Sequence, residues 1–195
     1  MSTFSPVIDR ALAVSATAHR HQERKGSQVP YIIHPVHVAI LLMRHDFPEE
    51  VIVAAILHDV VEDTTVTIDE IGSEFGAEVA RLVAAVSEQK QEGNQPLPWR
   101  TRKEAQLDRL RSADRNTAAL KTADAIHNLR ATLTDFARIG DEVWKRFRGS
   151  PDEHLWYYAT LAEILRPQLG DHPLALELRH AISELHSKHP TSARA

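Results

Sequence analysis

Apolar residues along the chain recur at helical rather than alternating intervals. In the first segment they fall at Val7, Ala11, Val14 and Ala18, a spacing that predicts a helix ending near His19. Similar patterns predict further helices over about 35–45, 49–62, 68–87, 101–112, 119–139, 151–166 and 173–187. No run shows the convincing period of two that is typical of a half-buried strand. We therefore predict an all-α fold.

Capping and helix-breaking residues refine these boundaries. Thr67, with Glu70 three residues later, forms a capping-box pattern that predicts a helix start. Gly76 predicts that the helical segment 68–87 is broken into two pieces. The polar segment 88–101 contains one glycine and two prolines, so we predict an irregular loop.

Proline also bears on His34. The residue before a proline avoids the α region, and proline is favoured at the first position of a helix. We therefore expect His34 to be extended, immediately before a helix that Pro35 opens.

Length and composition fit one soluble domain. The chain has 195 residues, of which 43% are hydrophobic, so we expect a single domain over 1–187 and a disordered tail over 188–195. A net charge of −4 argues against a nucleic-acid partner. No apolar run approaches the roughly 20 residues of a membrane span, so we expect a cytoplasmic protein without a membrane partner. The absence of cysteine excludes disulfides, thiolate metal sites and cysteine nucleophiles.

Histidine and carboxylate side chains then remain as candidate metal ligands. They suit Mn, Fe, Co or Zn, and the candidates are His34, the adjacent His58 and Asp59, and Asp124. Asp124 lies in an Ala- and Leu-rich helical stretch, where a carboxylate is rarely buried unless it is paired or binds a cation. A His-Asp dipeptide alone occurs often by chance, but this set on three predicted helices is much less common. The sequence therefore predicts a metal site.

Two further acids follow the dyad. On the predicted helix His58 lies over Glu62 and Asp59 over Asp63, because residues i and i+4 share a face. A divalent ion lowers the pKa of water near it, so hydrolysis is the natural reaction. Glu62 and Asp63 are then placed to orient that water or to protonate a leaving oxygen.

Cations near these positions indicate an anionic substrate. Arg24 and Lys25 precede His34, whereas Lys121, Asn128 and Arg130 flank Asp124. Arginine and lysine are the side chains that recognise phosphate. Taken singly, each of these cations is more typical of a solvated surface. His127, on the Asp124 face, is either a packing residue or a neighbour of the site, and the remaining histidines are interpreted as surface or packing residues.

The combined pattern resembles the HD-domain phosphohydrolases, and within them the hydrolase domain of the RelA/SpoT proteins and the small alarmone hydrolases. The matching stretches are RKGSQVPYIIHPVHVA, AAILHDVVEDTTVTIDEIGSEFGAEVARLV and LKTADAIHNLR. The resemblance implies a multi-helix HD-domain fold packed around a central metal site. The residues it implies for one Mn²⁺ are His34, His58, Asp59 and Asp124.

The resemblance also implies an activity. It assigns Glu62 and Asp63 as the catalytic acids, and Arg24, Lys25 and Asn128 as neighbours of the nucleotide. The reaction would remove pyrophosphate from the 3′ position of guanosine tetra- or pentaphosphate, giving GDP or GTP.

The chain departs from the family pattern at several positions. Ala125 stands where a basic residue is usual, Ala131 replaces a polar residue, and Lys90 matches a family lysine only weakly within a longer 88–113 segment. Further candidates for substrate contact are Arg148, Tyr157 and Tyr158.

Two other functions remain open at this stage. One is a related phosphohydrolase that acts on an adenine alarmone, a nucleoside phosphate or NADPH. The other is a helical nucleotide sensor that keeps the metal only as a structural centre. The sequence also leaves a homo-oligomer open.

Overall fold

Helices dominate the computed structural model, which describes residues 4–92 and 95–189. Its elements, in chain order, are α1 (Pro6–Ala18), α2 (Ile33–Met43), α3 (Glu49–Leu57), α4 (Val60–Asp63), α5 (Ile68–Phe75), α6 (Ala77–Val86), β1 (Gln91–Glu92), β2 (Gln95–Pro96), α7 (Trp99–Leu110), α8 (Arg115–Ile139), the 3₁₀ segment η1 (Gly140–Arg146), α9 (Pro151–Leu169) and α10 (Pro173–Lys188). The predicted all-α class is confirmed. No described helix is both long and apolar enough to cross a membrane.

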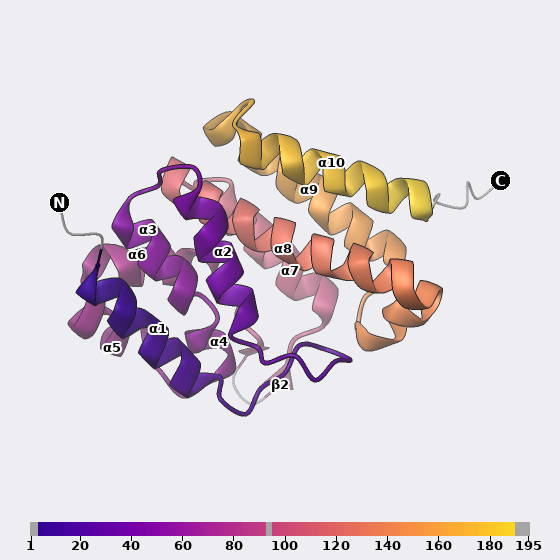
Figure 1. Cartoon of the computed structure of the whole chain (residues 1–195). Coiled ribbons are helices and arrows are strands. Elements are labelled where there is room, and N and C mark those ends of the chain that lie inside the picture. The colour runs from indigo at the N-terminus through magenta and orange to yellow at the C-terminus, as the bar shows by residue number, and fades with distance from the viewer. Residues whose placement is uncertain (1–3, 93–94, 190–195) are drawn as a thin grey trace.

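The long helix α8 joins two groups of helices. It packs against α2, α3 and α6 from the first half of the chain, and against α9 and α10 from the second half. Figure 1 shows α9 and α10 along the upper edge of the molecule, with the N-terminal helices gathered at the left. Because α8 contacts both groups, a side chain on α8 can meet residues that are far apart in sequence.

Helix α3 forms the centre of the N-terminal group. Every residue from Val51 to Leu57 is buried, which matches a stretch that is apolar all round. The chain leaves this buried helix at His58 and Asp59. The dyad is therefore carried by one of the most completely packed elements of the structure.

Helix α5 begins where the capping pattern predicted. The Thr67 hydroxyl accepts a hydrogen bond from the Glu70 amide, and the Glu70 carboxylate accepts one from the Thr67 amide. The helix ends at Phe75, and Gly76 follows with a φ of 93°, a backbone conformation that L side chains rarely adopt. The predicted break between α5 and α6 is confirmed.

The prediction of an extended His34 is wrong. His34 is the second residue of α2, which begins at Ile33, and its amide donates to the Tyr31 carbonyl at 2.9 Å. Pro35 is accommodated because the first amides of a helix have no intrahelical acceptor, so its missing N–H costs nothing there. This early start fixes His34 on a regular helix rather than in a loop.

The single helix predicted over 49–62 is also corrected. It is divided into α3 and α4, and His58 and Asp59 lie at the junction. The Nδ1 atom of His58 lies 2.7 Å from the Ala55 carbonyl oxygen, which in an uninterrupted helix would accept the Asp59 amide. The ring N–H therefore competes with the backbone at this turn.

Two short features escaped the sequence patterns. Within the predicted loop, Gln91–Glu92 pairs with Gln95–Pro96 as a two-stranded antiparallel ladder, and the loop ends at α7. The segment η1 follows α8 directly. Of the predicted tail, Lys188 belongs to α10 and His189 accepts a hydrogen bond from Trp144 Nε1 at 2.7 Å. Residues 190–195 lie outside the described residues.

Candidate metal centre and active site

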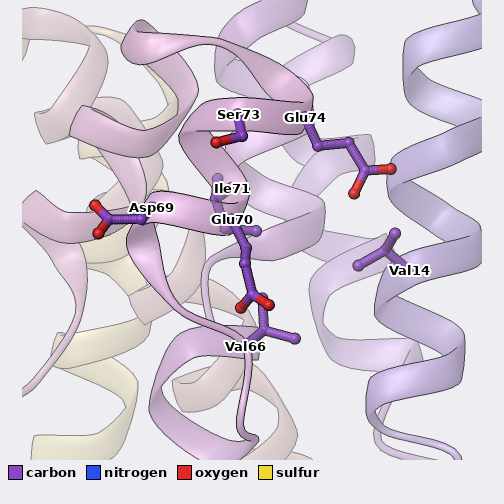
Figure 2. A pocket seen from close by; sticks show the side chains of 7 residues that line it. All are labelled: Val14, Val66, Asp69, Glu70, Ile71, Ser73 and Glu74. Carbon is purple, nitrogen blue, oxygen red and sulfur yellow. The ribbon is translucent and has the colours of Figure 1, made fainter.

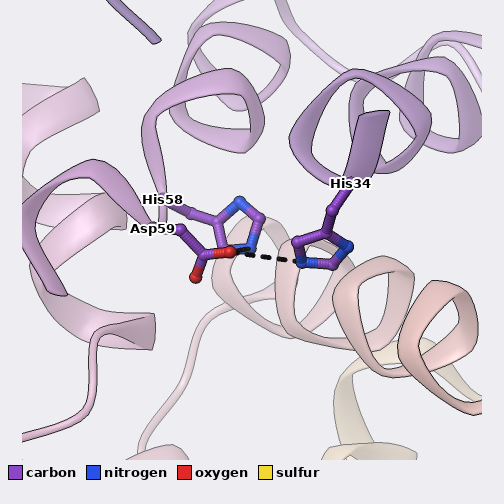
Figure 3. Close-up of side chains that lie close together, drawn as sticks. All are labelled: His34, His58 and Asp59. Carbon is purple, nitrogen blue, oxygen red and sulfur yellow. Dashed lines mark ion pairs between the residues drawn. The ribbon is translucent and has the colours of Figure 1, made fainter. Parts of the chain in front are cut away.

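Three predicted ligands meet where α2 faces the α3–α4 junction. One ligand atom from each of His34, His58 and Asp59 lies within 4.8 Å of the other two. Asp59 Oδ2 is 3.3 Å from His34 Nε2 and 3.3 Å from His58 Nε2. Figure 3 shows both imidazole rings directed toward this carboxylate, one from α2 and the other from the end of α3.

Asp124 on α8 completes the group. Its Oδ1 atom lies 3.2 Å from His34 Nε2 and 3.8 Å from His58 Nε2. The structure therefore brings together four side chains from α2, the α3–α4 junction and α8. Their arrangement presents two imidazole nitrogens and two carboxylate oxygens to a common space.

The two histidines have partners on the side away from this space. The His58 Nδ1–H donates to the Ala55 carbonyl, which leaves Nε2 free to act as a ligand. His34 Nδ1 lies 2.8 Å from Nδ1 of His127. Burial, and then the interaction with His34, lower the pKa of His127 to about 3, so His127 is neutral and can accept the His34 Nδ1–H. Both rings thus present Nε2 to the centre.

The two aspartates are oriented in the same way. The Tyr31 hydroxyl donates to Asp59 Oδ2 at 2.7 Å. Lys121 donates to Asp124 Oδ2 at 2.7 Å, and the Asn128 amide donates to Asp124 Oδ1. Such outer hydrogen bonds fix the orientation of metal ligands. Tyr31 was not predicted as part of the site, because its only signal in the sequence is its place three residues before His34.

Opposite charges dominate the electrostatics of the group. Burial acts to lower the pKa of His58, but the carboxylates of Asp59 and Asp124 outweigh it and raise that pKa to about 9. Burial acts to raise the pKa of Asp59, but His58 and His34 hold it below the ordinary range. The carboxylates of Asp59 and Asp124 therefore attract positive charge to this space, either as protons or as a cation.

The group fits a divalent cation. His58 Nε2 is buried and, although Asp59 Oδ2 lies 3.3 Å away, makes no well-aligned hydrogen bond within the described part of the chain. A buried polar atom without a partner is costly unless an ion or another ligand satisfies it. Two neutral imidazoles and two carboxylates carry a charge of −2, which a divalent ion would balance, and such nitrogen and oxygen donors suit several first-row metals.

Glu62 and Asp63, the second pair of acidic residues, lie against the segment that follows α6. Glu62 Oε1 accepts the Glu88 amide at 2.5 Å, and Asp63 pairs with Lys90, whose ammonium is also 3.5 Å from Glu62 Oε2. Glu88 is held in turn by Lys103 and by Arg102 of α7. The segment between α6 and α7 thus packs against Glu62 and Asp63, a role that the sequence did not indicate.

Glu62 makes the stability of the metal-free protein depend on pH. Burial, and then the negative charge of Asp59, raise its pKa from 4.5 to about 7. Because the pKa of Glu62 is higher in the folded protein than in the unfolded chain, the folded state favours the protonated side chain. The contribution of Glu62 to the free energy of unfolding is therefore complete below about pH 4.5 and is lost as the pH rises through 7. The glutamine in Glu62→Gln cannot ionise, so above pH 7 the free energy of unfolding of this variant should exceed that of wild type by up to about 3 kcal/mol. Urea unfolding in EDTA at pH 5 and pH 8 measures this gain, and an equal difference at both values would contradict it.

The predicted cations divide into two groups: Arg24 and Lys25 lie beside the candidate centre, and Lys121 is bonded to one of its carboxylates. Arg24 donates to Asn128 Oδ1 at 2.8 Å, so it lies next to a partner of Asp124. Partial burial, together with the charges of Lys103 and Lys90, lowers the pKa of Lys25, which places three ammonium groups in one region. Lys121 is buried against Asp124 and therefore orients a candidate ligand rather than offering a free charge.

Arg130 belongs to neither group. Its guanidinium pairs with Glu184 at 2.8 Å and with Glu177 at 3.5 Å, both on α10. Arg130 therefore links α8 to α10, and its contact with a substrate stays a prediction. Its position in the helix was visible in the sequence, but its partners were not.

The remaining candidates lie near α7 and α9. The Tyr157 hydroxyl donates to Gln106 Oε1 at 2.8 Å, so it is engaged with α7. Its ring centre is 4.5 Å from the Lys103 ammonium and 5.2 Å from the ring centre of Tyr158. Arg148 is exposed, and its charge acts on Lys25.

A separate hollow of about 470 Å³ lies between α1 and α5. Figure 2 shows Val14 of α1 across from Glu70 and Glu74 of α5. Glu74 is paired with Arg10, and Glu70 is used in the cap of α5. None of the four metal-ligand candidates lines this hollow.

Comparison with known proteins gives a consistent result. Residues 11–151 match the HD domain family. The chain is 38% identical over 188 residues to human guanosine-3′,5′-bis(diphosphate) 3′-pyrophosphohydrolase MESH1. The alignment covers 94% of this chain and 97% of the human protein. It is 34% identical over 177 residues to the bifunctional (p)ppGpp synthase/hydrolase SpoT of Escherichia coli K12, covering 88% of this chain and 23% of SpoT.

A solved structure agrees with these sequence relatives. It is described as a metazoan ortholog of SpoT that hydrolyses ppGpp, and it superposes with a TM-score of 0.75 at 25% identity. The match covers 94% of this chain and 98% of the other. Nearly the whole fold is therefore shared with that protein.

Proposed function

The chain belongs to the HD domain family, and from this we propose that it is a metal-dependent 3′-pyrophosphohydrolase of guanosine tetra- and pentaphosphate. The products are pyrophosphate and GDP or GTP. The observation that carries the proposal is the meeting of His34, His58, Asp59 and Asp124 in a chain that aligns with nearly all of a named hydrolase of this type.

We assign these four side chains as the ligands of one divalent ion, with Mn²⁺ as the proposed metal. The unpartnered Nε2 of His58 and the outer hydrogen bonds of all four ligands support the assignment. When bound, the cation supplies Lewis acidity for water and for a phosphoryl oxygen.

The acidic pair handles protons beside this centre. In the reaction, a water molecule gives up one proton as its oxygen bonds to the 3′-linked phosphorus, the bond from that phosphorus to the ribose 3′ oxygen breaks, and the 3′ oxygen takes up one proton. Glu62, with its raised pKa, is suited to exchange a proton near neutral pH. Asp63, paired with Lys90, is the second acid placed to orient water.

The cations offset the negative charge of the substrate. Arg24 is held beside the centre by Asn128, while the charges of Lys103 and Lys90 act on Lys25 in the same region. Such preorganised positive charge stabilises the charge that develops during phosphoryl transfer. Arg24 and Lys25 are therefore the proposed contacts for the phosphates.

A nucleotide panel tests the proposed function. Purified protein with Mn²⁺ should release pyrophosphate from guanosine tetraphosphate, and EDTA should abolish the release. Parallel incubations with the adenine analogue and with NADPH distinguish pyrophosphate from monophosphate products. Release of no pyrophosphate from the guanosine substrate, with turnover of another nucleotide, would overturn the assignment of substrate.

A further inference from the structure

The segment that carries Lys25 is a tight turn. The Arg24 carbonyl accepts the Ser27 amide at 3.0 Å, so Lys25 and Gly26 occupy the middle positions. Gly26 has a φ of 71°, a conformation that favours glycine at the second middle position of such a turn. The direction of Lys25 therefore depends on how this turn is held.

Arg146, the last residue of η1, covers Gly26. A Cβ atom added to Gly26 would overlap Cδ, Nε and Cζ of Arg146. The glycine thus serves both the backbone conformation and the close approach of this arginine. The two residues lie far apart in sequence, so the contact is tertiary.

A carboxylate fixes Arg146 in this place. Asp135 of α8 accepts from Arg146 Nη1 at 2.7 Å, and the two side chains are only 18% and 28% exposed. The next residue, Phe147, places its ring centre 5.7 Å from the Lys25 ammonium. Arg146 and Phe147 therefore hold one side of the turn.

The other side of the turn meets α8 nearer the metal centre. Arg24 donates to Asn128, which itself donates to Asp124. The turn is consequently held between Asn128 on one side and the end of η1 on the other. Only the second contact is independent of the proposed ligands.

We propose that Arg146 is a positioning residue, which seats the turn so that Lys25 faces the phosphates of an anionic nucleotide. The inference rests on the proposed function for its substrate, but not for its structural part. Because Arg146 is paired with Asp135, it acts through the turn and not as a direct phosphate ligand.

Hydrogen exchange tests the structural part without any turnover. In Arg146→Ala, the amide of Ser27, which donates to the Arg24 carbonyl, and the amide of Arg24, which donates to the Val29 carbonyl, should exchange faster than in wild type. Asp135→Asn should act in the same direction because it releases Arg146. Arg138→Ala is the matched control, since Arg138 also pairs with Asp135 but is 62% exposed and is not among the nearest neighbours of Gly26. Unchanged exchange in Arg146→Ala would overturn the inference.

Kinetics test the consequence for the substrate. Arg146→Ala should raise the KM for guanosine tetraphosphate about tenfold while kcat stays within about twofold, because the turn affects binding more than chemistry. In a Lys25→Ala background the same change should have little further effect. Additive effects would mean that Arg146 binds phosphate directly, and an unchanged KM would mean that the turn is held without it. Both outcomes contradict the proposal.

The two proposals can fail separately. If wild type releases no pyrophosphate, the proposed function fails, and hydrogen exchange still decides whether Arg146 seats the turn. If wild type is active but Arg146→Ala matches it in both exchange and KM, the positioning role fails alone.

Discussion

His58→Ala is expected to lower the hydrolysis of guanosine tetraphosphate by at least about 10³-fold, because a divalent ion contributes several kcal/mol to the transition state. The imidazole is nearly inaccessible, with 4% of the side chain exposed, and its buried Nε2 has no hydrogen-bond partner among the described residues. Alanine removes this nitrogen and leaves no atom to replace it. Initial rates of pyrophosphate release with saturating Mn²⁺ measure the loss.

Thermal unfolding separates the loss of the metal from the loss of the fold. Mn²⁺ should raise the Tm of wild type and change that of His58→Ala much less, since a ligand that binds only the folded state stabilises it. His21→Ala is the control, because His21 is exposed and its bond is to Arg20. His58→Gln provides a variant closer in size. Full Mn²⁺-dependent activity in either His58 variant would contradict the ligand assignment.

Chemical type explains why the centre could be predicted from the sequence. In a chain without cysteine, histidine and carboxylate remained as candidate ligands, and Asp124 lies in an Ala- and Leu-rich helical stretch, where an unpaired charge is costly. The structure places their side chains around one space. A buried carboxylate in an Ala- and Leu-rich helix therefore carried more information than the common His-Asp dipeptide.

Residues that act through long-range contacts could not be found in this way. Tyr31 and Lys103 are ordinary by sequence, and their roles come from the Asp59 and Glu88 carboxylates that tertiary packing brings to them. Arg130 is a second example. It lies six residues after Asp124, but its pairing with Glu184 on α10 could not be foreseen from the sequence.

Local competition explains the errors in the fold. The apolar pattern predicted the helix that contains α3, but it could not show that the His58 ring would take the Ala55 carbonyl. The start of α2 was misplaced because the preference of a residue before proline was outweighed by the turn at Tyr31. Strands of two residues, such as Gln91–Glu92, are too short to show any period.

The same burial that assembles the centre makes it depend on internal charge balance. Lys121 and Asp124 are 8% and 9% exposed, and their charged groups are 2.7 Å apart. Burial acts to lower the pKa of Lys121, but the Asp124 carboxylate outweighs it and holds that pKa well above its ordinary value. The pair is therefore ionised at neutral pH, and each charge depends on the other.

Lys121→Met should consequently destabilise the metal-free protein by about 3–5 kcal/mol, the usual cost of leaving one member of a buried ion pair without its partner. Methionine keeps much of the volume, so the loss reports on charge rather than on a cavity. Urea unfolding in EDTA measures it. With saturating Mn²⁺ the loss should be smaller, because a cation beside Asp124 replaces part of the missing positive charge.

A second substitution distinguishes this explanation from simple loss of packing. Asp124→Asn in the Lys121→Met background removes the unpaired charge, so in EDTA the double variant should be more stable than Lys121→Met alone. In Mn²⁺ that order should reverse or narrow, because asparagine is a poorer ligand than aspartate for a divalent ion. If Lys121→Met costs the same in EDTA and in Mn²⁺, and Asp124→Asn recovers nothing, then Lys121 stabilises the helix by packing and the charge of Asp124 is balanced elsewhere.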